Sequence, residues 1–232
     1  MITIENLSKK YNGDYALNIQ LLRIEKNECF GLVGNNGAGK TTLFQLILDL
    51  IKASSGTVLI GGEDVSRSED WKTFTGSYLD EHMLLSFLTP DEYFDTLRKI
   101  YDLSEGDLTT HLARFEVFFN GEILGKQKYI RDLSRGNIKK VGITAALLGD
   151  PKIVVLDEPF ENLDPTSQNR LKKLIQAERD QKNTTFLISS HDLSHVTDVC
   201  NRIVLLENGH IIKDLKEEKE AMAYVLSEYF NR

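Results

Sequence analysis

Short apolar runs rich in β-branched residues alternate along the chain with longer amphipathic stretches. Four of these runs read as strands: CFGLVG from Cys29, SYL from Ser77, KIVVLD from Lys152 and TTFLIS from Thr184. Alternation of this kind predicts an α/β domain with a largely parallel sheet. Open sheets of this class bind ligands beyond the carboxyl ends of their strands. The residues that follow these runs are therefore the first candidates for function.

Two regions depart from this pattern. The segments ITIENL and ALNIQLLRI, with TVLIGGEDV from Thr57, predict antiparallel strands and a Gly-Gly turn, hence a small β layer beside the core. From Thr89 to Gly149 the pattern is helical: PDEYFDTLRKIYDL opens with a proline, and apolar residues recur at helix spacing at Ile138, Val141, Ala145 and Leu148. We expect one domain over 1–232, with the core and β subdomain at about 1–81 and 150–232 and a helical subdomain at about 82–149.

A glycine-rich segment follows the first of the predicted parallel strands. Residues 34–41 read GNNGAGKT, the full GxxxxGK[ST] pattern, directly before the helical stretch TTLFQLILDLIK. Such a loop turns successive backbone N–H groups toward phosphate oxygens, and the helix that follows adds its positive end. Lys40 would reach the β- and γ-phosphates, and the Thr41 hydroxyl would bind Mg²⁺. The predicted nucleotide-binding residues are Gly34, Asn35, Asn36, Gly37, Ala38, Gly39, Lys40, Thr41 and Thr42.

Two adjacent carboxylates end another predicted strand, in the segment KIVVLDEP. Asp157 would hold Mg²⁺ at the sheet edge, and Glu158 would polarise an attacking water as a general base. An acidic turn after a strand is by itself usually only a solvated loop. Because a P-loop precedes it in this chain, we favour the catalytic interpretation.

Charge, the length of the apolar runs and the cysteine spacing exclude several classes of protein. A net charge of -7 and a pI near 5.3 argue against a nucleic-acid-binding protein, which needs a basic face. The longest apolar runs, such as LFQLILDLI, are too short to cross a bilayer, and no secretory signal opens the sequence. Cys29 and Cys200 lie far apart and in no CxxC pattern, so we predict two space-filling thiols without a disulfide or zinc site. We expect a cytoplasmic protein.

The segment from Asp132 to Asp164, DLSRGNIKKVGITAALLGDPKIVVLDEPFENLD, carries a family resemblance. LSRGNIKK is similar to the signature motif of ABC ATPases, usually LSGGQ followed by basic residues, and the resemblance extends over nearly the whole chain. It implies an α/β P-loop NTPase with a RecA-like core. It also implies that Ser134 and Gly136 contact the γ-phosphate bound by a second subunit, and that Asp164 of NLDP crosses the dimer interface.

Two further residues take their roles from the same resemblance. His191 in SSHD looks like the switch histidine that senses the γ-phosphate and the attacking water, and Tyr11 is similar to the aromatic that stacks on adenine. Tyr15 is an alternative for the adenine contact. His191 and His195, four residues apart, could also be metal ligands, but no HExxH pattern or third ligand accompanies them.

The sequence departs from the family pattern at Arg135 and Asn137, where the family usually has glycine and glutamine. In the family, a glutamine of the lid links Mg²⁺ to the membrane partner, and the position that matches it best here is Glu81. A glutamate at that position occurs among exporter-type ABC subunits that resemble this chain, which favours export. The resemblance thus implies a Mg-dependent ATPase that works with a second ABC ATPase subunit, identical or different, and a transmembrane permease on the inner face of the cell membrane. The alternative is an ABC ATPase that assembles a cofactor or complex without transport.

Overall fold

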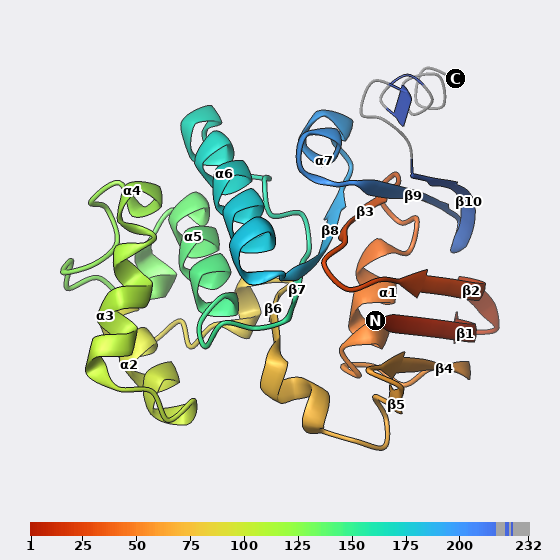
Figure 1. Cartoon of the computed structure of the whole chain (residues 1–232), viewed down its shortest axis with the longest axis horizontal. Coiled ribbons are helices and arrows are strands. Elements are labelled where there is room, and N and C mark those ends of the chain that lie inside the picture. Colours follow the sequence, from red (N-terminus) through yellow and green to blue (C-terminus); the bar gives the residue numbers. More distant parts are fainter. Residues whose placement is uncertain (217–220, 223, 225–232) are drawn as a thin grey trace.

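The computed structural model describes residues 1–216, 221, 222 and 224. Two sheets organise this part of the chain (Figure 1). The larger has the order β10-β9-β3-β8-β7-β6, and the smaller the order β2-β1-β4-β5. The strands of the larger sheet are β3 (Cys29–Val33), β6 (Thr75–Tyr78), β7 (Ile153–Leu156), β8 (Thr185–Ser190), β9 (Arg202–Glu207) and β10 (His210–Leu215).

Strands β6, β7, β8, β3 and β9 pair in parallel, and only β10 runs antiparallel to its neighbour. The predicted parallel core, with its four strands, is confirmed. Strands β9 and β10 were missing from the prediction, although β9 pairs directly with β3. Their sequence, RIVLLENGHIIKDL, reads equally well as an isolated hairpin, and only pairing with β3 makes it part of the core sheet.

The smaller sheet consists of β1 (Ile2–Tyr11), β2 (Asp14–Ile24), β4 (Ser55–Ile60) and β5 (Glu63–Asp64). All of its pairs are antiparallel, as the alternation predicts. Helix α1 (Lys40–Ile47) lies between this sheet and β3 (Figure 1). Leu43 and Phe44 of the helix join Phe30 and Leu32 of β3 in one buried cluster with the small sheet. The helix that follows the P-loop is therefore packed between the two sheets.

The segment between β6 and β7 is helical. Helices α2 (Pro90–Ile100), α3 (Glu105–Ala113), α4 (Glu116–Phe119) and α5 (Arg135–Ala146) lie to one side of the large sheet, with 3₁₀ turns at Glu81–Met83 and Ile130–Asp132 (Figure 1). A capping box of Thr89 and Glu92, followed by proline at the first turn, fixes the start of α2. Another 3₁₀ turn, Asp70–Phe74, precedes β6.

Helices α6 (Pro165–Lys182) and α7 (Leu193–Val199) complete the described part of the fold. They bury their apolar residues with α2–α5 against the face of the sheet opposite α1. Alternate residues of β3 therefore serve two cores, Phe30 and Leu32 on one face and Cys29 and Val33 on the other. Cys29 and Cys200, distant in sequence, lie side by side with their Sγ atoms 3.6 Å apart and are not disulfide-bonded.

Within the described residues, no helix has both the length and the apolar character needed to cross a membrane.

A buried histidine joins two helices of the helical segment. His111 of α3 is 5% exposed, its Nε2 lies 2.9 Å from the Thr144 carbonyl oxygen of α5, and its ring packs 4.9 Å from Phe115. Because a carbonyl only accepts, Nε2 carries the proton of the neutral ring. Burial lowers the pKa of His111 to about 4, against the hydrogen bond to Thr144.

We predict that this histidine makes the free energy of unfolding depend on pH. Unfolded His111 takes up a proton below its ordinary pKa of about 6.5, whereas the folded ring stays neutral until about pH 4. The unfolded state thus binds more protons in this window, so stability falls as pH falls, by up to about 1.4 kcal/mol per pH unit. Urea unfolding followed by Trp71 fluorescence between pH 7.5 and 5 measures the slope. His111→Gln, which keeps a donor but does not titrate, should flatten it; an unchanged slope contradicts the prediction.

Candidate functional site

The register of the parallel ladder determines which side chains meet at the carboxyl edge of the large sheet. Leu156 of β7 pairs with Ile188 of β8, and Ser190 of β8 pairs with Val33 of β3. The residues that follow these pairs are the carboxylates after β7, His191 after β8 and the P-loop after β3. Three segments that are not neighbours in the chain thus end at one place, and the P-loop is more than 100 residues from the other two.

The P-loop and the acidic strand are in direct contact there. The Thr41 hydroxyl donates a hydrogen bond of 2.5 Å to Oδ2 of Asp157. Burial raises the pKa of the Asp157 carboxyl, opposed by hydrogen bonds from Ser189 and Thr41. Hydroxyl and carboxylate oxygens are the ligand types that Mg²⁺ prefers. The residues predicted as a magnesium site therefore lie together and fit that ion chemically.

Ser189 holds both carboxylate residues in place. Its hydroxyl donates to Oδ1 of Asp157 and accepts a hydrogen bond of 2.8 Å from the Glu158 backbone N–H. It is fully buried. In the sequence Ser189 is only the first residue of SSHD, and no role was predicted for it. A serine near the end of a strand is too common to stand out, and its two partners become visible only once β7 and β8 are paired.

Glu158 lies between a lysine and a histidine. Its Oε1 is 3.3 Å from Nζ of Lys40, and its Oε2 is 3.0 Å from Nδ1 of His191 and 3.3 Å from the His191 backbone nitrogen. The backbone of Glu158 has a φ of 46°, a left-handed conformation that is uncommon for a residue other than glycine. The predicted base and the predicted switch histidine are thus in contact, and the P-loop lysine faces the same carboxylate.

The P-loop is held from the side by the small sheet. Gly39 has a φ of 105°, and a side chain there would approach the Ala16 carbonyl oxygen of β2 to 2.8 Å, so only glycine fits. Lys40 donates to the carbonyl oxygen of Gly34 at 2.6 Å and is 6% exposed. The Ala38 carbonyl accepts from Gly209 in the turn between β9 and β10. The missed strands therefore also support the P-loop.

The two tyrosines considered for the adenine contact lie on the hairpin of β1 and β2. Tyr11 and Tyr15 are each about half exposed, and the ammonium groups of Lys9 and Lys10 lie 5.0 Å and 4.2 Å from their respective ring centres. Tyr15 directly precedes Ala16, which touches the P-loop. Both rings are accessible, so both remain candidates.

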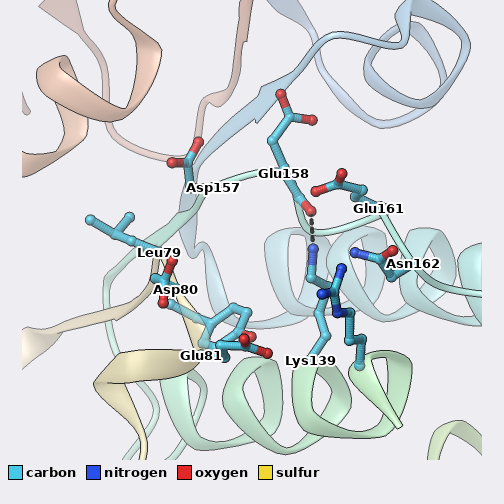
Figure 2. A pocket seen from close by; sticks show the side chains of 10 residues that line it. Leu79, Asp80, Glu81, Lys139, Asp157, Glu158, Glu161 and Asn162 are labelled. Carbon is cyan, nitrogen blue, oxygen red and sulfur yellow. Dashed lines mark hydrogen bonds between the residues drawn. The ribbon is translucent and has the colours of Figure 1, made fainter. Parts of the chain in front are cut away.

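A cleft of about 350 Å³ opens between the sheet edge and α5 (Figure 2). The predicted residues Asp157, Glu158 and Glu81 line it. Asp80, which was not singled out from the sequence, lines it as well and caps the 3₁₀ turn that contains Glu81. Either carboxylate can therefore occupy the lid position that was assigned to Glu81.

The signature residues line a second cleft, of about 380 Å³. Ser134, Gly136 and Asp164 meet there, and none of the P-loop residues is among the described residues that line it. Ser134 caps α5 by accepting from the Asn137 N–H at 3.3 Å, and Asp164 caps α6 by accepting from the Ser167 N–H at 3.0 Å. The chain thus separates its P-loop from its signature residues.

Fold and site together define the class: an α/β P-loop NTPase, with a phosphate-binding loop after β3 facing an acidic pair after β7. The family model "ABC transporter" matches residues 17–161. The chain belongs to the ABC transporter family, and it has the form of its ATP-binding subunits.

Individual proteins agree with this assignment. The ABC transporter ATP-binding protein YtrB of Bacillus subtilis is 32% identical over 227 residues, which cover 95% of this chain and 74% of YtrB. The zinc import ATP-binding protein ZnuC of Rickettsia bellii is 34% identical over 212 residues, 91% of this chain and 84% of ZnuC. The dimeric post-hydrolysis structure of the ATP-binding cassette MJ0796 with ADP and Pi shares the fold, with a TM-score of 0.82, 23% identity and coverage of 93% and 98% of the two chains.

We predict that Ser189→Ala lowers the free energy of unfolding by about 1 to 3 kcal/mol, because Oδ1 of the buried Asp157 carboxylate and the Glu158 N–H both lose their side-chain partner. Ser190→Ala is a matched control, since this neighbouring buried serine accepts one hydrogen bond, from Asp192. Urea unfolding of the three proteins measures the difference. Equal losses in both variants would contradict the bridging role of Ser189.

Proposed function

We propose that this chain hydrolyses ATP to ADP and phosphate and that it drives transport through a separate transmembrane partner. The proposal rests on the surroundings of Glu158 at the carboxyl edge of the sheet. Its carboxylate lies 3.3 Å from Nζ of Lys40 and 3.0 Å from Nδ1 of His191. A cation that can bind the γ-phosphate, a carboxylate that can act as a base and a histidine are thus in contact at this edge. Hydrolysis of a phosphoanhydride needs charge neutralisation and an oriented water at one point.

Each side chain has a distinct task in this reaction. Lys40 and the backbone N–H groups of residues 34–42 hold the phosphates and balance their charge. Glu158 takes a proton from the attacking water, which therefore becomes a stronger nucleophile. His191 fixes the Glu158 carboxylate by its contact at Oε2 and senses the γ-phosphate beside it. Tyr11 or Tyr15 stacks on the adenine.

Thr41 and Asp157 would hold Mg²⁺, with Glu81 or Asp80 at the lid. The ion supplies Lewis-acid neutralisation of phosphate charge when it is bound. Ser189 keeps the Asp157 carboxylate aligned for this task from the opposite side.

The active unit is a dimer of two such chains, identical or different. Ser134, Gly136 and Asp164 line a cleft apart from their own P-loop, at the start of α5 and α6, where helix N-termini favour an anion. This separation supports a contact with the γ-phosphate bound by a facing chain. The cassette MJ0796 has been described as a dimer with ADP and Pi.

A membrane permease is the proposed partner, and it would hold the chain at the inner face of the cell membrane. Three exposed apolar residues lie on the segment that follows Glu81: Met83, Leu85 and Phe87. These three residues belong to the proposed helical subdomain, residues 82–149. Their exposed apolar side chains are suited to contact a partner. We favour export because of the carboxylate at the lid, although one relative, ZnuC, is named as a zinc import protein.

We expect Lys40→Ala to abolish ATP binding or hydrolysis, because the P-loop loses the charge that faces the β- and γ-phosphates. Titration with a fluorescent ATP analogue and a phosphate-release assay measure the two effects. Lys173→Ala removes an exposed lysine of α6 and serves as the control. Wild-type binding and hydrolysis in Lys40→Ala would refute the P-loop assignment.

We expect Glu158→Gln to slow hydrolysis by roughly 10²- to 10⁴-fold, or about 2.7 to 5.5 kcal/mol of barrier, because glutamine keeps the shape but cannot act as a base. Bound ATP then persists and pulls the equilibrium toward the dimer. Size-exclusion chromatography with Mg-ATP should show a dimer, and ADP should not replace ATP.

Adding Ser134→Arg to this variant should restore the monomer, because a bulky side chain then occupies the position of the facing phosphate. A double variant that still dimerises with ATP would show that α5 makes no contact across the dimer. If the chain pairs only with a different cassette, the single variant is measured together with that partner.

A further inference from the structure

A buried lysine of helix α5 contacts the backbone of the proposed base. Nζ of Lys139 donates a hydrogen bond of 2.6 Å to the carbonyl oxygen of Glu158 (Figure 2), and the residue is 8% exposed. Lys139 reaches from the helix across the cleft of about 350 Å³ to the loop after β7. In the sequence Lys139 is only one of the basic residues that follow the signature motif.

The surroundings of Lys139 are acidic. Burial lowers the pKa of its ammonium group, and four carboxylates oppose this effect: Glu161, Glu158, Asp157 and Glu81. These negative neighbours favour a charged ammonium group. A hydrogen bond from a charged donor to a carbonyl is stronger than one between neutral groups. Lys139 therefore supplies a strong, directed contact at the Glu158 carbonyl.

Glu158 needs such a contact because its backbone conformation is unfavourable. At a φ of 46° it has left the strand geometry of β7, and a left-handed residue other than glycine persists only where its surroundings hold it. Two side chains do so: Ser189 accepts from its N–H, and Lys139 donates to its carbonyl at 2.6 Å, a shorter bond than the 3.3 Å turn hydrogen bond that the same carbonyl accepts from the Glu161 N–H. The peptide groups on both sides of Glu158 are thus fixed from outside the strand ladder.

The side-chain direction of Glu158 follows from this backbone. With both peptide groups held, the carboxylate faces Lys40 through Oε1 and His191 through Oε2. We propose that Lys139 is a positioning residue for the general base: it holds the left-handed backbone of Glu158 so that the carboxylate meets the attacking water. This proposal rests on the proposed role of Glu158 in ATP hydrolysis.

Lys139→Met tests it, because methionine keeps the length and the apolar stem but removes the donor. We expect kcat for ATP hydrolysis to fall about tenfold or more, while KM and the affinity for a fluorescent ATP analogue change less than about twofold. The structure places the bond of Lys139 at Glu158 and not at the P-loop, so binding should be spared. An unchanged kcat, or a loss confined to KM, would overturn the proposal.

Lys140→Met is the matched control for folding. Lys140 is the adjacent lysine of α5, also buried, and its Nζ lies 5.7 Å from the ring centre of Phe118. Thermal unfolding of both variants shows whether the loss of either buried cation destabilises the fold to the same extent, which separates a fall in kcat from a loss of folding. If Lys139→Met does not fold, Lys139→Gln is used, because its shorter side chain cannot span the same distance and the same fall in kcat is expected.

A double-mutant cycle with Glu158→Gln separates positioning from a general structural effect. Single-turnover hydrolysis is measured for Lys139→Met, Glu158→Gln and the double variant. If Lys139 acts through the base, its substitution should change the residual rate of Glu158→Gln less than about twofold. A loss of the same factor in both backgrounds would overturn the proposal. A slow Glu158→Gln beside a fully active Lys139→Met refutes the positioning role alone. A fully active Glu158→Gln refutes the assignment of Glu158 as the base, and a wild-type chain that hydrolyses no ATP refutes the proposed function itself.

Discussion

The register of the parallel ladder through β7, β8 and β3 is the constraint on which the rest of this structure depends. It aligns Leu156 with Ile188 and Val33 with Ser190, so the loops that follow the three strands leave the sheet at one level. A shift of one residue would turn each strand's alternate side chains to the other core, exchanging Phe30 and Leu32 with Cys29 and Val33. The two hydrophobic cores therefore secure the geometry of the site.

Charged side chains gather at this edge of the sheet, next to the two hydrophobic cores, where an unpaired charge would be unfavourable. Asp157 and Lys40 are buried, and Glu158 is largely so. Each is held by a specific partner: Asp157 by Thr41 and Ser189, Lys40 by Gly34 and Glu158. Because buried charges are costly without such partners, the residues form a single network in which the loss of one affects the others.

The departure from the family pattern at Arg135 has a local steric explanation. Gly136 cannot change without movement of the loop before α6, since a side chain there would come within 2.8 Å of the Asn162 carbonyl oxygen. Arg135 is exposed and lines the clefts on both sides of the loop, where a long side chain has room. The position that retains glycine is therefore the one with backbone against it. The substituted position is open.

Sequence alone determined what depends on neighbouring residues: the P-loop with its helix, the acidic strand end, the capped helices and the alternation that separates the two sheets. Tertiary structure decided what depends on residues far apart in the chain. Five such contacts join segments whose local sequences do not indicate their partners. They are the contact of Glu158 with His191, the hydrogen bonds of Ser189, the bond from Lys139 to Glu158, the pairing of β9 with β3 and the proximity of Cys29 and Cys200. Hydrophobic periodicity specifies which face of an element is buried, but the partner on that face follows only from the packing of the whole chain.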